Sequence, residues 1–267
     1  MIYFVATPIG NLKDITLRAL ETLRAADVIF CEDTRHSLKL LNAYEIKKPL
    51  YPCHKFNERE AALKILAAHK EGKEIAVISD AGMPVISDPG NTVCKVLTEE
   101  GAPFTVIPGA NAALSALVLS ALPADRFAFI GFLPDKAGEK KRLLEKYKNL
   151  DITTVFHVAP QDVDRDISAV YAVFGERRAC AVREITKMHE EAVRFNLSQG
   201  LQGEKRGEYV LLVEGASGEN ELNALTEKEH LLHYISGGMD KKDAVKQVAK
   251  DRGVPKSEIY KIALDID

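Results

Sequence analysis

The feature that most constrains the fold is a series of short apolar segments that alternate with helical patterns through the first half of the chain. These segments are rich in β-branched residues and almost free of charge, which is typical of strands buried on both faces of a sheet. They occupy residues 2–7, 28–31, 75–79 and 104–107. Strands that alternate with helices in this way form parallel sheets covered by helices. The sequence therefore predicts an α/β lobe over residues 1–122 with a mainly parallel sheet.

A second α/β lobe is predicted over residues 123–218, after the linker-like Pro123-Ala-Asp-Arg126. Helical patterns cover residues 139–148 and 162–174. Predicted strands cover residues 127–132, 153–158, 179–184 and 209–214, and residues 190–196 add an antiparallel strand. The second sheet is therefore expected to be mixed.

A helical segment is predicted over residues 219–267, where short helical patterns replace strands at 227–235, 241–250 and 257–264. The last two patterns flank Gly253-Val-Pro255, a turn of the kind found in helix-turn-helix motifs. Between residues 236 and 262 basic residues outnumber acidic ones only modestly. An RNA-contacting segment and a small packing appendage are both consistent with this pattern.

The composition favours a globular protein with a large apolar core and argues against a membrane protein. Hydrophobic residues make up 46% of the 267 residues, so the chain can bury a large core. The 36 Lys and Arg against 39 Asp and Glu give a net charge of −3, which argues against a continuous basic coat. There is no apolar stretch long enough for a membrane span, and the N-terminal residues do not resemble a signal peptide. The four scattered cysteines predict reduced thiols in the cytoplasm, and the histidine spacing gives no support for a metal site.

The segment 79–90, Ser-Asp-Ala-Gly-Met-Pro-Val-Ile-Ser-Asp-Pro-Gly, is unusually long for a connection between a strand and a helix. Its Gly, Pro, Ser and Asp residues fix backbone angles and supply local hydrogen bonds. Residues 8–11 and 108–111 also follow predicted strands. Because open α/β sheets bind ligands at the carboxyl ends of their strands, these three loops predict one ligand site. The alternative is a stiff surface loop.

Polar clusters at strand ends are the candidates for chemistry. Glu32-Asp-Thr-Arg35 follows the second predicted strand, and Asp80 and Asp88 bracket the long loop. Residues 184–191 form a further polar cluster, for which a solvated edge is the simpler interpretation. The chain lacks the glycine-rich dinucleotide motif, the phosphate-loop lysine, the nucleophile elbow and the zinc-binding histidine pair.

Two local helix signals are also specific. Asn57 with Glu60 three residues later predicts a capping box at the start of a helix that Gly72 ends. The pattern over residues 111–122 has almost no charge, which predicts a helix covered on most sides, either within the first lobe or at a dimer interface.

These motifs resemble the bacterial ribosomal small-subunit methyltransferase I family of the tetrapyrrole methylase superfamily, from the first residue to the last. The matching residues are Val5-Ala-Thr-Pro-Ile-Gly-Asn-Leu12, Asp14-Ile-Thr-Leu-Arg-Ala-Leu20, Glu32-Asp-Thr-Arg35, Ser79-Asp-Ala-Gly82 with Pro84, Ile86-Ser-Asp-Pro-Gly90, Pro108-Gly109, Gly131-Phe-Leu-Pro134 and Arg183-Glu184 with Thr186-Lys187 and His189-Glu-Glu191. The chain departs from the family pattern at Met83, Phe56, Val158-Ala-Pro-Gln161 and Pro108-Gly-Ala-Asn111.

The resemblance implies a cytoplasmic homodimer of two-lobed chains that uses S-adenosyl-L-methionine to methylate the ribose 2′-hydroxyl of a cytidine in the decoding region of 16S rRNA. It places the methyl donor in the cleft between the lobes. Carried over by position, the donor-binding residues are Pro8, Asp80, Ala81, Gly82, Pro84, Asn111, Ala112, His157 and Val158.

A ribose hydroxyl is a weak acid, so a nearby carboxylate is expected to take its proton. The candidates are Glu32, Asp33 and Asp88, with Arg35 orienting a carboxylate or contacting phosphate. RNA contacts in the helical segment are predicted at Lys241, Lys242, Lys246, Lys250, Lys256 and Lys261. Two other functions remain open on the residues alone, namely methylation of a tetrapyrrole and non-catalytic RNA binding.

Overall fold

The computed structural model describes residues 1–203, 205–216, 221–264 and 266. The chain divides into two compact units. The two-lobed unit contains residues 1–148 and 152–214, and the C-terminal unit contains residues 149–151 and 215–267. The predicted boundary at 218–219 falls outside the described residues, and the division at 122–123 stays a prediction.

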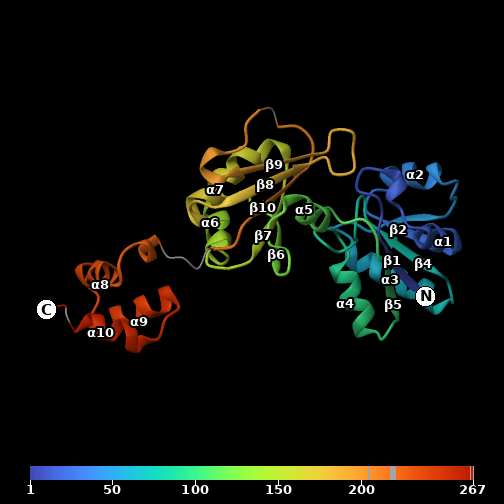
Figure 1. Ribbon diagram of the computed structural model, residues 1–267. Coiled ribbons are helices and arrows are strands. Elements are labelled where there is room, and N and C mark those ends of the chain that lie inside the picture. The colour runs from blue at the N-terminus through green and yellow to red at the C-terminus, as the bar shows by residue number, and fades with distance from the viewer. Residues whose placement is uncertain (204, 217–220, 265, 267) are drawn as a thin grey trace. The chain divides into compact units, whose positions relative to one another are not determined.

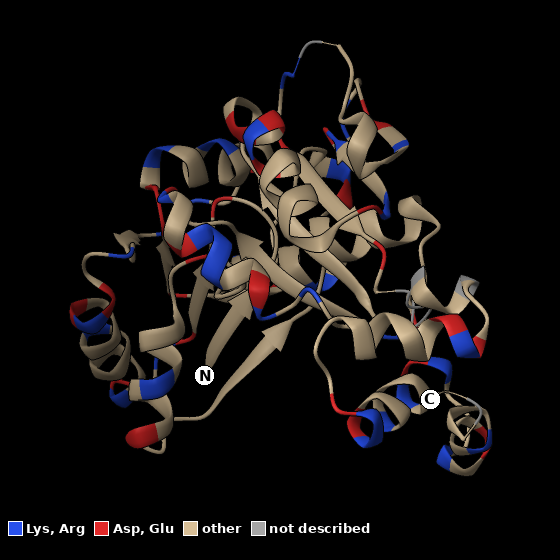
Figure 2. Cartoon of the chain, turned by 90° about the vertical axis from the view of Figure 1, so that its left-hand side faces the viewer, with Lys and Arg blue, Asp and Glu red and all other residues tan. Residues whose placement is uncertain are grey.

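The first sheet is entirely parallel, with the strand order β3-β2-β4-β1-β5. Figure 1 labels β1, β2, β4 and β5 of this sheet. Its strands are β1 (Ile2–Val5), β2 (Val28–Cys31), β3 (Leu50–Pro52), β4 (Ile75–Ile78) and β5 (Phe104–Ile107). None of these strands carries a charged residue, whereas Figure 2 shows acidic and basic residues interspersed along the helices and loops. The prediction of a parallel first sheet is confirmed.

Alternation along the strands divides this lobe into two cores. In β1, Phe4 packs with helices on one face, and Val5 packs with helices on the other. Fully burying such a side chain stabilises the fold by roughly 1.5–3 kcal/mol. The helices of the first face are α3 (Glu58–Lys70) and α4 (Asn91–Glu99), and those of the second are α1 (Leu17–Ala25) and α2 (Thr34–Ala43).

The start of α3 differs from the capping box expected there. Asn57 occupies the N-cap position, but its side chain makes no capping hydrogen bond. Instead, Asn57 Oδ1 accepts a hydrogen bond from the His54 backbone N at 2.7 Å, and Asn57 Nδ2 donates to the Pro52 carbonyl at 3.0 Å. The prediction was wrong because the amide is used to fold back the preceding loop.

The second sheet is mixed, as predicted, with the order β6-β7-β10-β8-β9. Strands β6 and β7 are parallel, and the remaining neighbours are antiparallel. The bounds are β6 (Phe127–Phe132), β7 (Thr153–Val158), β8 (Arg178–Arg183), β9 (Glu191–Asn196) and β10 (Tyr209–Val213). Because β10 runs antiparallel to β7, its first residue, Tyr209, lies opposite the last residue of β7, Val158.

Helix α5 (Ala112–Ser120) packs on the second sheet through Ala113, Ala116 and Leu117. Arg194 of β9 donates hydrogen bonds to the carbonyls of Leu119 and Ser120 at the end of this helix. The expected cover on most sides is wrong within the two-lobed unit, because Leu114 is 49% exposed and Val118 is 79% exposed. The other face of the sheet is covered by α6 (Ala137–Glu145) and α7 (Val163–Phe174).

The C-terminal unit consists of α8 (Glu227–Ser236), α9 (Lys241–Arg252) and α10 (Lys256–Ala263) around a core that includes Leu231, Val248 and Ile259. Gly253 ends α9 in the left-handed conformation, at φ 65°. Short 3-10 helices occur in both units, at Leu12–Asp14, Pro160–Asp162, Leu197–Gln199 and Glu221–Ala224. Within the described ranges, the helices are too short or too polar to cross a bilayer.

Candidate active site

A cavity of about 450 Å³ lies where the loops of the two sheets face each other in the two-lobed unit. The first lobe contributes loop residues after β1 and β4, and α5 contributes its first residue. The second lobe contributes the edge at which β7 ends and β10 begins. The lining residues are Ile9, Ala81, Ile86, Ser87, Asp88, Ala112, Phe132, His157, Val158, Ala159, Pro160, Gln161, Ile185, Glu208, Tyr209 and Val210.

The long loop after β4 is held to the loop after β1 by a two-residue bridge. Thr7 N donates to the Gly82 carbonyl at 2.9 Å, and Gly82 N donates to the Thr7 carbonyl at 3.1 Å. Beyond this bridge, Val85 and Ser87 have positive φ angles of 78° and 66°. A β-branched residue in that region is strained, and such strain is characteristic of functional sites. The loop is therefore a fixed structure with two strained residues, one of which, Ser87, lines the cavity.

Close backbone approach joins the two lobes at this site. A Cβ atom on Gly10 would lie 2.6 Å from Lys187 Cγ, and one on Gly131 would lie 3.0 Å from Ser87 Oγ. The pairing of β6 with β7 shifts register between Phe129 and Gly131, so Gly131 adjoins an irregularity in the strand. Glycine at both positions lets loops from one lobe rest against the other without side-chain interference.

Carboxylates gather at the ends of β2 and β4. Burial raises the pKa of Glu32, and the negative charges of Asp88 and Asp80 raise it further. The pKa of Asp88 is also raised, chiefly by burial and further by the negative charge of Asp80. Asp80 Oδ1 accepts a hydrogen bond from the Asp33 backbone N at 3.2 Å. Asp80 therefore acts on both Glu32 and Asp88, and Asp88, which lines the cavity, also acts on Glu32.

Asp33 and Arg35 form a separate pair. Asp33 is the N-cap of α2, and its Oδ1 accepts a hydrogen bond from the Arg35 backbone N at 2.8 Å. The Arg35 guanidinium donates to both carboxylate oxygens, at 3.1 and 2.7 Å. These hydrogen bonds hold the pKa of Asp33 far below its usual range. Asp33 is therefore poorly suited to accept a proton, and Arg35 orients Asp33 rather than Glu32 or Asp88.

His157 provides an unsatisfied polar atom in the second-lobe wall. Its Nε2 is buried and has no hydrogen-bond partner among the described residues. Its ring lies between Phe129 and Phe132, at centroid distances of 5.1 and 5.3 Å. Burial lowers the pKa of His157, which favours the neutral imidazole. A buried polar atom without a partner is costly, and a bound ligand would remove that cost.

Part of the polar cluster 184–191 forms ion pairs at the edge of the cavity, through Lys187, Glu184 and Glu208, which we call the Lys187 bracket. Lys187 Nζ lies 3.0 Å from both Glu184 Oε1 and Glu208 Oε2. Glu184 Oε1 also accepts a hydrogen bond from the Glu208 backbone N at 3.0 Å. The bracket joins the loop after β8 to the residue before β10, and Glu208 and Ile185 line the cavity.

The structure brings together Ala81, Asp88, Ala112, His157 and Val158 of the residues predicted to form the site. Others lie in the same loops but outside the lining, namely Pro8, Asp80, Gly82, Pro84 and Asn111. Asn111 caps α5, since its Oδ1 accepts a hydrogen bond from Leu114 N at 3.0 Å.

The loops 8–11 and 79–90, which were predicted to form a ligand site, supply the lining residues Ile9, Ile86 and Ser87. Sequence reasoning did not assign to the site the lining residues Phe132, Ile185, Glu208, Tyr209 and Val210. Recognising that the strand at 209–213 is antiparallel would have placed its beginning, rather than its end, at the site.

The predicted RNA-contacting lysines belong to the C-terminal unit and differ in their surroundings. Lys246 is paired with Asp243 at 2.7 Å, and Lys241 donates a hydrogen bond to the Ile266 carbonyl. The remaining side chains are exposed, at Lys242, Lys250, Lys256 and Lys261.

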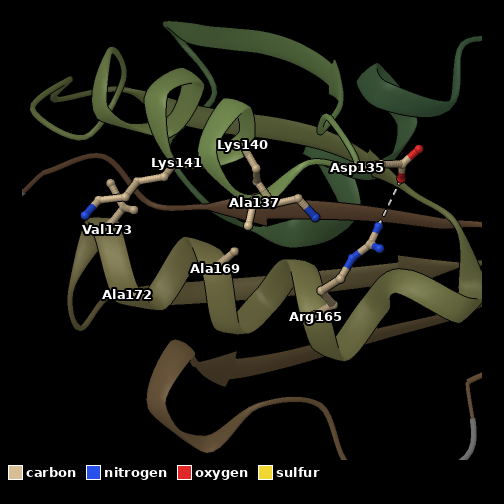
Figure 3. A pocket seen from close by; sticks show the side chains of 8 residues that line it. All are labelled: Asp135, Ala137, Lys140, Lys141, Arg165, Ala169, Ala172 and Val173. Atoms are coloured by element: carbon tan, nitrogen blue, oxygen red, sulfur yellow. Dashed lines mark hydrogen bonds and ion pairs between the residues drawn. The ribbon is translucent and has the colours of Figure 1, made fainter.

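A second cavity of about 240 Å³ lies between α6 and α7. Figure 3 shows Lys140 and Lys141 entering from α6 and Arg165 from α7, where Arg165 is paired with Asp135. Lys140 pairs with Asp166, and both side chains are almost completely buried. Lys140 and Arg165 are therefore each neutralised by a nearby carboxylate, whereas Lys141 is exposed. No cluster of side chains that could hold a metal ion occurs within the described parts of the chain.

Comparison with known proteins identifies the class first. The family model for Tetrapyrrole (Corrin/Porphyrin) Methylases matches residues 1–200. The crystal structure of the methyltransferase CobJ is similar with a TM-score of 0.62 and 17% identity, over 80% of this chain and 94% of that chain. A uroporphyrin-III C-methyl transferase from Thermus thermophilus, complexed with S-adenyl homocysteine, gives a TM-score of 0.55 and 19% identity over 80% and 96%. At these identities the likeness shows the fold alone.

Full-length relatives then identify the particular family. A Bacillus subtilis (strain 168) protein named ribosomal RNA small subunit methyltransferase I is 43% identical, over 97% of this chain and 92% of its own length. A Synechocystis protein with the same name is 34% identical, over 100% of this chain and 98% of its own length. The chain belongs to the ribosomal RNA small subunit methyltransferase I family, within the tetrapyrrole methylases.

Proposed function

We propose that this protein transfers a methyl group from S-adenosyl-L-methionine to the ribose 2′-hydroxyl of a cytidine in the decoding region of 16S rRNA. We further propose that it acts on the small ribosomal subunit in the cytoplasm, as a homodimer. The observation that carries the proposal is the match to ribosomal RNA small subunit methyltransferases over nearly the whole chain. The cavity of the two-lobed unit supplies a site for that chemistry.

The residues around the cavity fit the methyl donor. Ala81 and Ala112 leave room along the first-lobe side, and the orphaned Nε2 of His157 offers a polar contact on the other. Val158, Tyr209 and Val210 add apolar surface. When bound, the donor supplies a methyl carbon whose bond to sulfur breaks as its bond to oxygen forms, leaving a neutral thioether. Pro8, Asp80, Gly82, Pro84 and Asn111 shape the loops around that position.

The proton of the ribose hydroxyl needs an acceptor as the oxygen attacks. Asp88 lines the cavity, and Glu32 lies close enough for its pKa to respond to Asp88. A raised pKa makes each carboxylate a stronger base than an exposed one. We assign proton removal to Asp88 or Glu32, with Asp80 holding the loop between them through its contact with the Asp33 backbone.

Two exposed surfaces support the proposed partners. On α5, Leu114 and Val118 form an apolar stripe that a second copy of the chain could cover. In the C-terminal unit, Lys242, Lys250 and Lys256 are exposed cations suited to RNA phosphates, and Lys241 and Lys246 are secondary candidates.

The decisive experiment supplies donor labelled in its methyl group together with small ribosomal subunits, free 16S rRNA or a tetrapyrrole. We expect label in the RNA, in an alkali-resistant dinucleotide because a methylated 2′-oxygen cannot attack the adjoining phosphate. The label should map to one cytidine ribose in the decoding region. Label in the tetrapyrrole instead, or no transfer to RNA in either form, would refute the proposal. Light scattering on the same preparation tests for the dimer.

A further inference from the structure

Phe56 is one of the most exposed large apolar residues in the described part of the chain, at 92%. Single exposed apolar residues are common on protein surfaces, so exposure alone carries no argument. Phe56 is distinguished by where the fold holds it and by the charges next to it.

The loop that carries Phe56 is fixed by hydrogen bonds on both sides. Cys53 N donates to the Cys31 carbonyl at 2.7 Å, which ties the loop to the end of β2. The Asn57 side chain accepts a hydrogen bond from the His54 backbone N and donates one to the Pro52 carbonyl. The Asn57 backbone N donates a further hydrogen bond to the His54 carbonyl at 2.9 Å. The ring of Phe56 packs edge to face with His54 at 6.2 Å. The exposed ring is therefore presented by a rigid turn.

This turn lies at the same sheet edge as the proposed proton acceptors. β3 is parallel to β2, so the residues after β3 emerge beside the residues after β2. The His54 imidazole is close enough to Glu32 to act electrostatically on its pKa. Glu32 in turn is coupled to Asp88, which lines the cavity. Phe56 therefore lies on the first-lobe side of the site, in the loop next to Glu32 and Asp88.

The charges around Phe56 favour a polyanion. Lys55 and Arg59 are exposed and have no ion-pair partner within the described residues. The acidic neighbours are engaged elsewhere, because Glu58 accepts a hydrogen bond from Thr92 N at 2.8 Å and Glu60 pairs with Lys64 at 2.7 Å. An exposed aromatic ring flanked by free cations is the arrangement by which proteins hold single-stranded nucleic acid.

We propose that Phe56 is a stacking platform for a nucleobase of the RNA that flanks the methylated nucleotide, with Lys55 and Arg59 contacting the adjoining phosphates. This inference rests on the proposed function and deepens it. Phe56 is a positioning residue, since stacking of the neighbouring base would set the register that brings one ribose to Asp88 and Glu32. Stacking on an aromatic ring tolerates any base, so this contact holds the strand and does not read its sequence.

The kinetic test compares Phe56→Ala, Phe56→Tyr and Leu63→Ala on the full-length protein with small ribosomal subunits. Leu63 is an exposed apolar residue of α3 and serves as the matched control. For Phe56→Ala we expect a 5- to 150-fold rise in KM for the particle, in the range of roughly 1–3 kcal/mol for a lost base stack. Donor affinity and Tm should not change, Phe56→Tyr should restore KM, and Leu63→Ala should behave like the parent.

A spectroscopic test uses the fact that the chain has no tryptophan. In Phe56→Trp the new indole is the sole one, and stacking on a base should quench its fluorescence when a single-stranded decoding-region oligonucleotide is added. Leu63→Trp should show no quenching. An unchanged KM in Phe56→Ala, or equal quenching in both tryptophan variants, would overturn the inference. If the parent protein still methylates RNA in that case, the proposed function stands. Absence of RNA methylation by the parent would overturn both.

Discussion

The two walls of the cavity are built differently. The first-lobe wall comes from loops that leave the ends of parallel strands. It contains Ser87, whose φ is positive, and Asp88, whose pKa is raised, with Val85 and Glu32 next to it. In the second-lobe wall the charges are paired, as in the Lys187 bracket, and the unsatisfied group is the neutral His157. Residues selected for stability are normally satisfied and unstrained. We infer from this comparison that the first lobe carries the proton chemistry, and that the donor is held between the first-lobe loops and the second-lobe surface at His157 and Val158.

The largest effect is expected from removing a proton acceptor in the first lobe. Asp88→Asn and Glu32→Gln keep the shape of the site but cannot take the ribose proton, so for whichever carboxylate is the base kcat should fall by roughly 10²–10⁴-fold. Donor affinity, measured by calorimetry, should stay close to that of the parent. Asp33→Asn is the matched control, because asparagine also serves as an N-cap. A larger loss of kcat in Asp33→Asn than in both other variants would reverse the assignment.

In the second lobe, the strongest effect should be on stability. Lys140→Met would leave Asp166 buried without its partner, and breaking a buried pair in this way costs about 3–5 kcal/mol. Urea unfolding of the parent and of Lys140→Met measures this loss. Lys141→Met is the control, since Lys141 is its exposed neighbour on the same helix. Equal stability of all three proteins would show that the α6–α7 pair does not support the second lobe.

Donor binding should depend on the close approach at Gly82. In Gly82→Leu the new Cβ would lie 3.2 Å from Ile9 Cγ2, so the side chain would push Ile9 toward the cavity that it lines. Overpacking of this kind costs about 1–3 kcal/mol. If donor binding has to move Ile9 back against that cost, donor affinity should fall about 5- to 150-fold.

Gly72→Leu is the control for this experiment, because Gly72 also has φ 81° but has no atom within 4 Å of the place where a Cβ would lie. It carries the backbone strain without the collision. Equal donor affinity in the two leucine variants and the parent would exclude the Gly82 loop from the donor site.

The pH dependence of stability should have opposite signs for two neighbouring carboxylates. The pKa of Asp88 is raised in the fold, so the folded state loses stability as pH rises through that pKa. Asp88→Asn should therefore unfold at a higher temperature than the parent at neutral pH, with the difference shrinking on acidification. The pKa of Asp33 is lowered, so its contribution is present at neutral pH and is lost as pH falls. Asp33→Asn should be less stable than the parent at neutral pH, and thermal melts that show the same sign for both would contradict the argument.

Much of this architecture follows from the sequence because buried parallel strands leave a strong apolar pattern. Two elements of the first lobe were nevertheless missed. Helix α2 begins within the polar cluster at Thr34, and β3 is a short edge strand that ends in Pro52. Helix α2 begins among polar residues, and β3 lacks the uninterrupted apolar run that marks the other strands of this sheet.

The site was predictable on the first-lobe side, where the loops follow the strands in sequence. On the second-lobe side the antiparallel β10 brings the beginning of a strand to the cavity, and Glu208 and Tyr209 were not singled out. The ranking of Glu32 above Asp33 could not come from sequence either, because it depends on which side chain caps α2.

The smallest effects are expected in the C-terminal unit, where lysines with and without an ion pair among the described residues can be compared directly. If Lys242, Lys250 and Lys256 contact phosphates, replacing each by glutamine should reduce the slope of log affinity against log salt by about 0.7–0.9. Lys246→Gln is the matched control. Because Lys246 is already paired with Asp243, replacing it should change the slope less. These side chains are exposed, so none of the variants should alter Tm or donor affinity. Filter binding to decoding-region RNA at several salt concentrations measures the slopes, and identical slopes for all four variants and the parent would assign this unit a packing role.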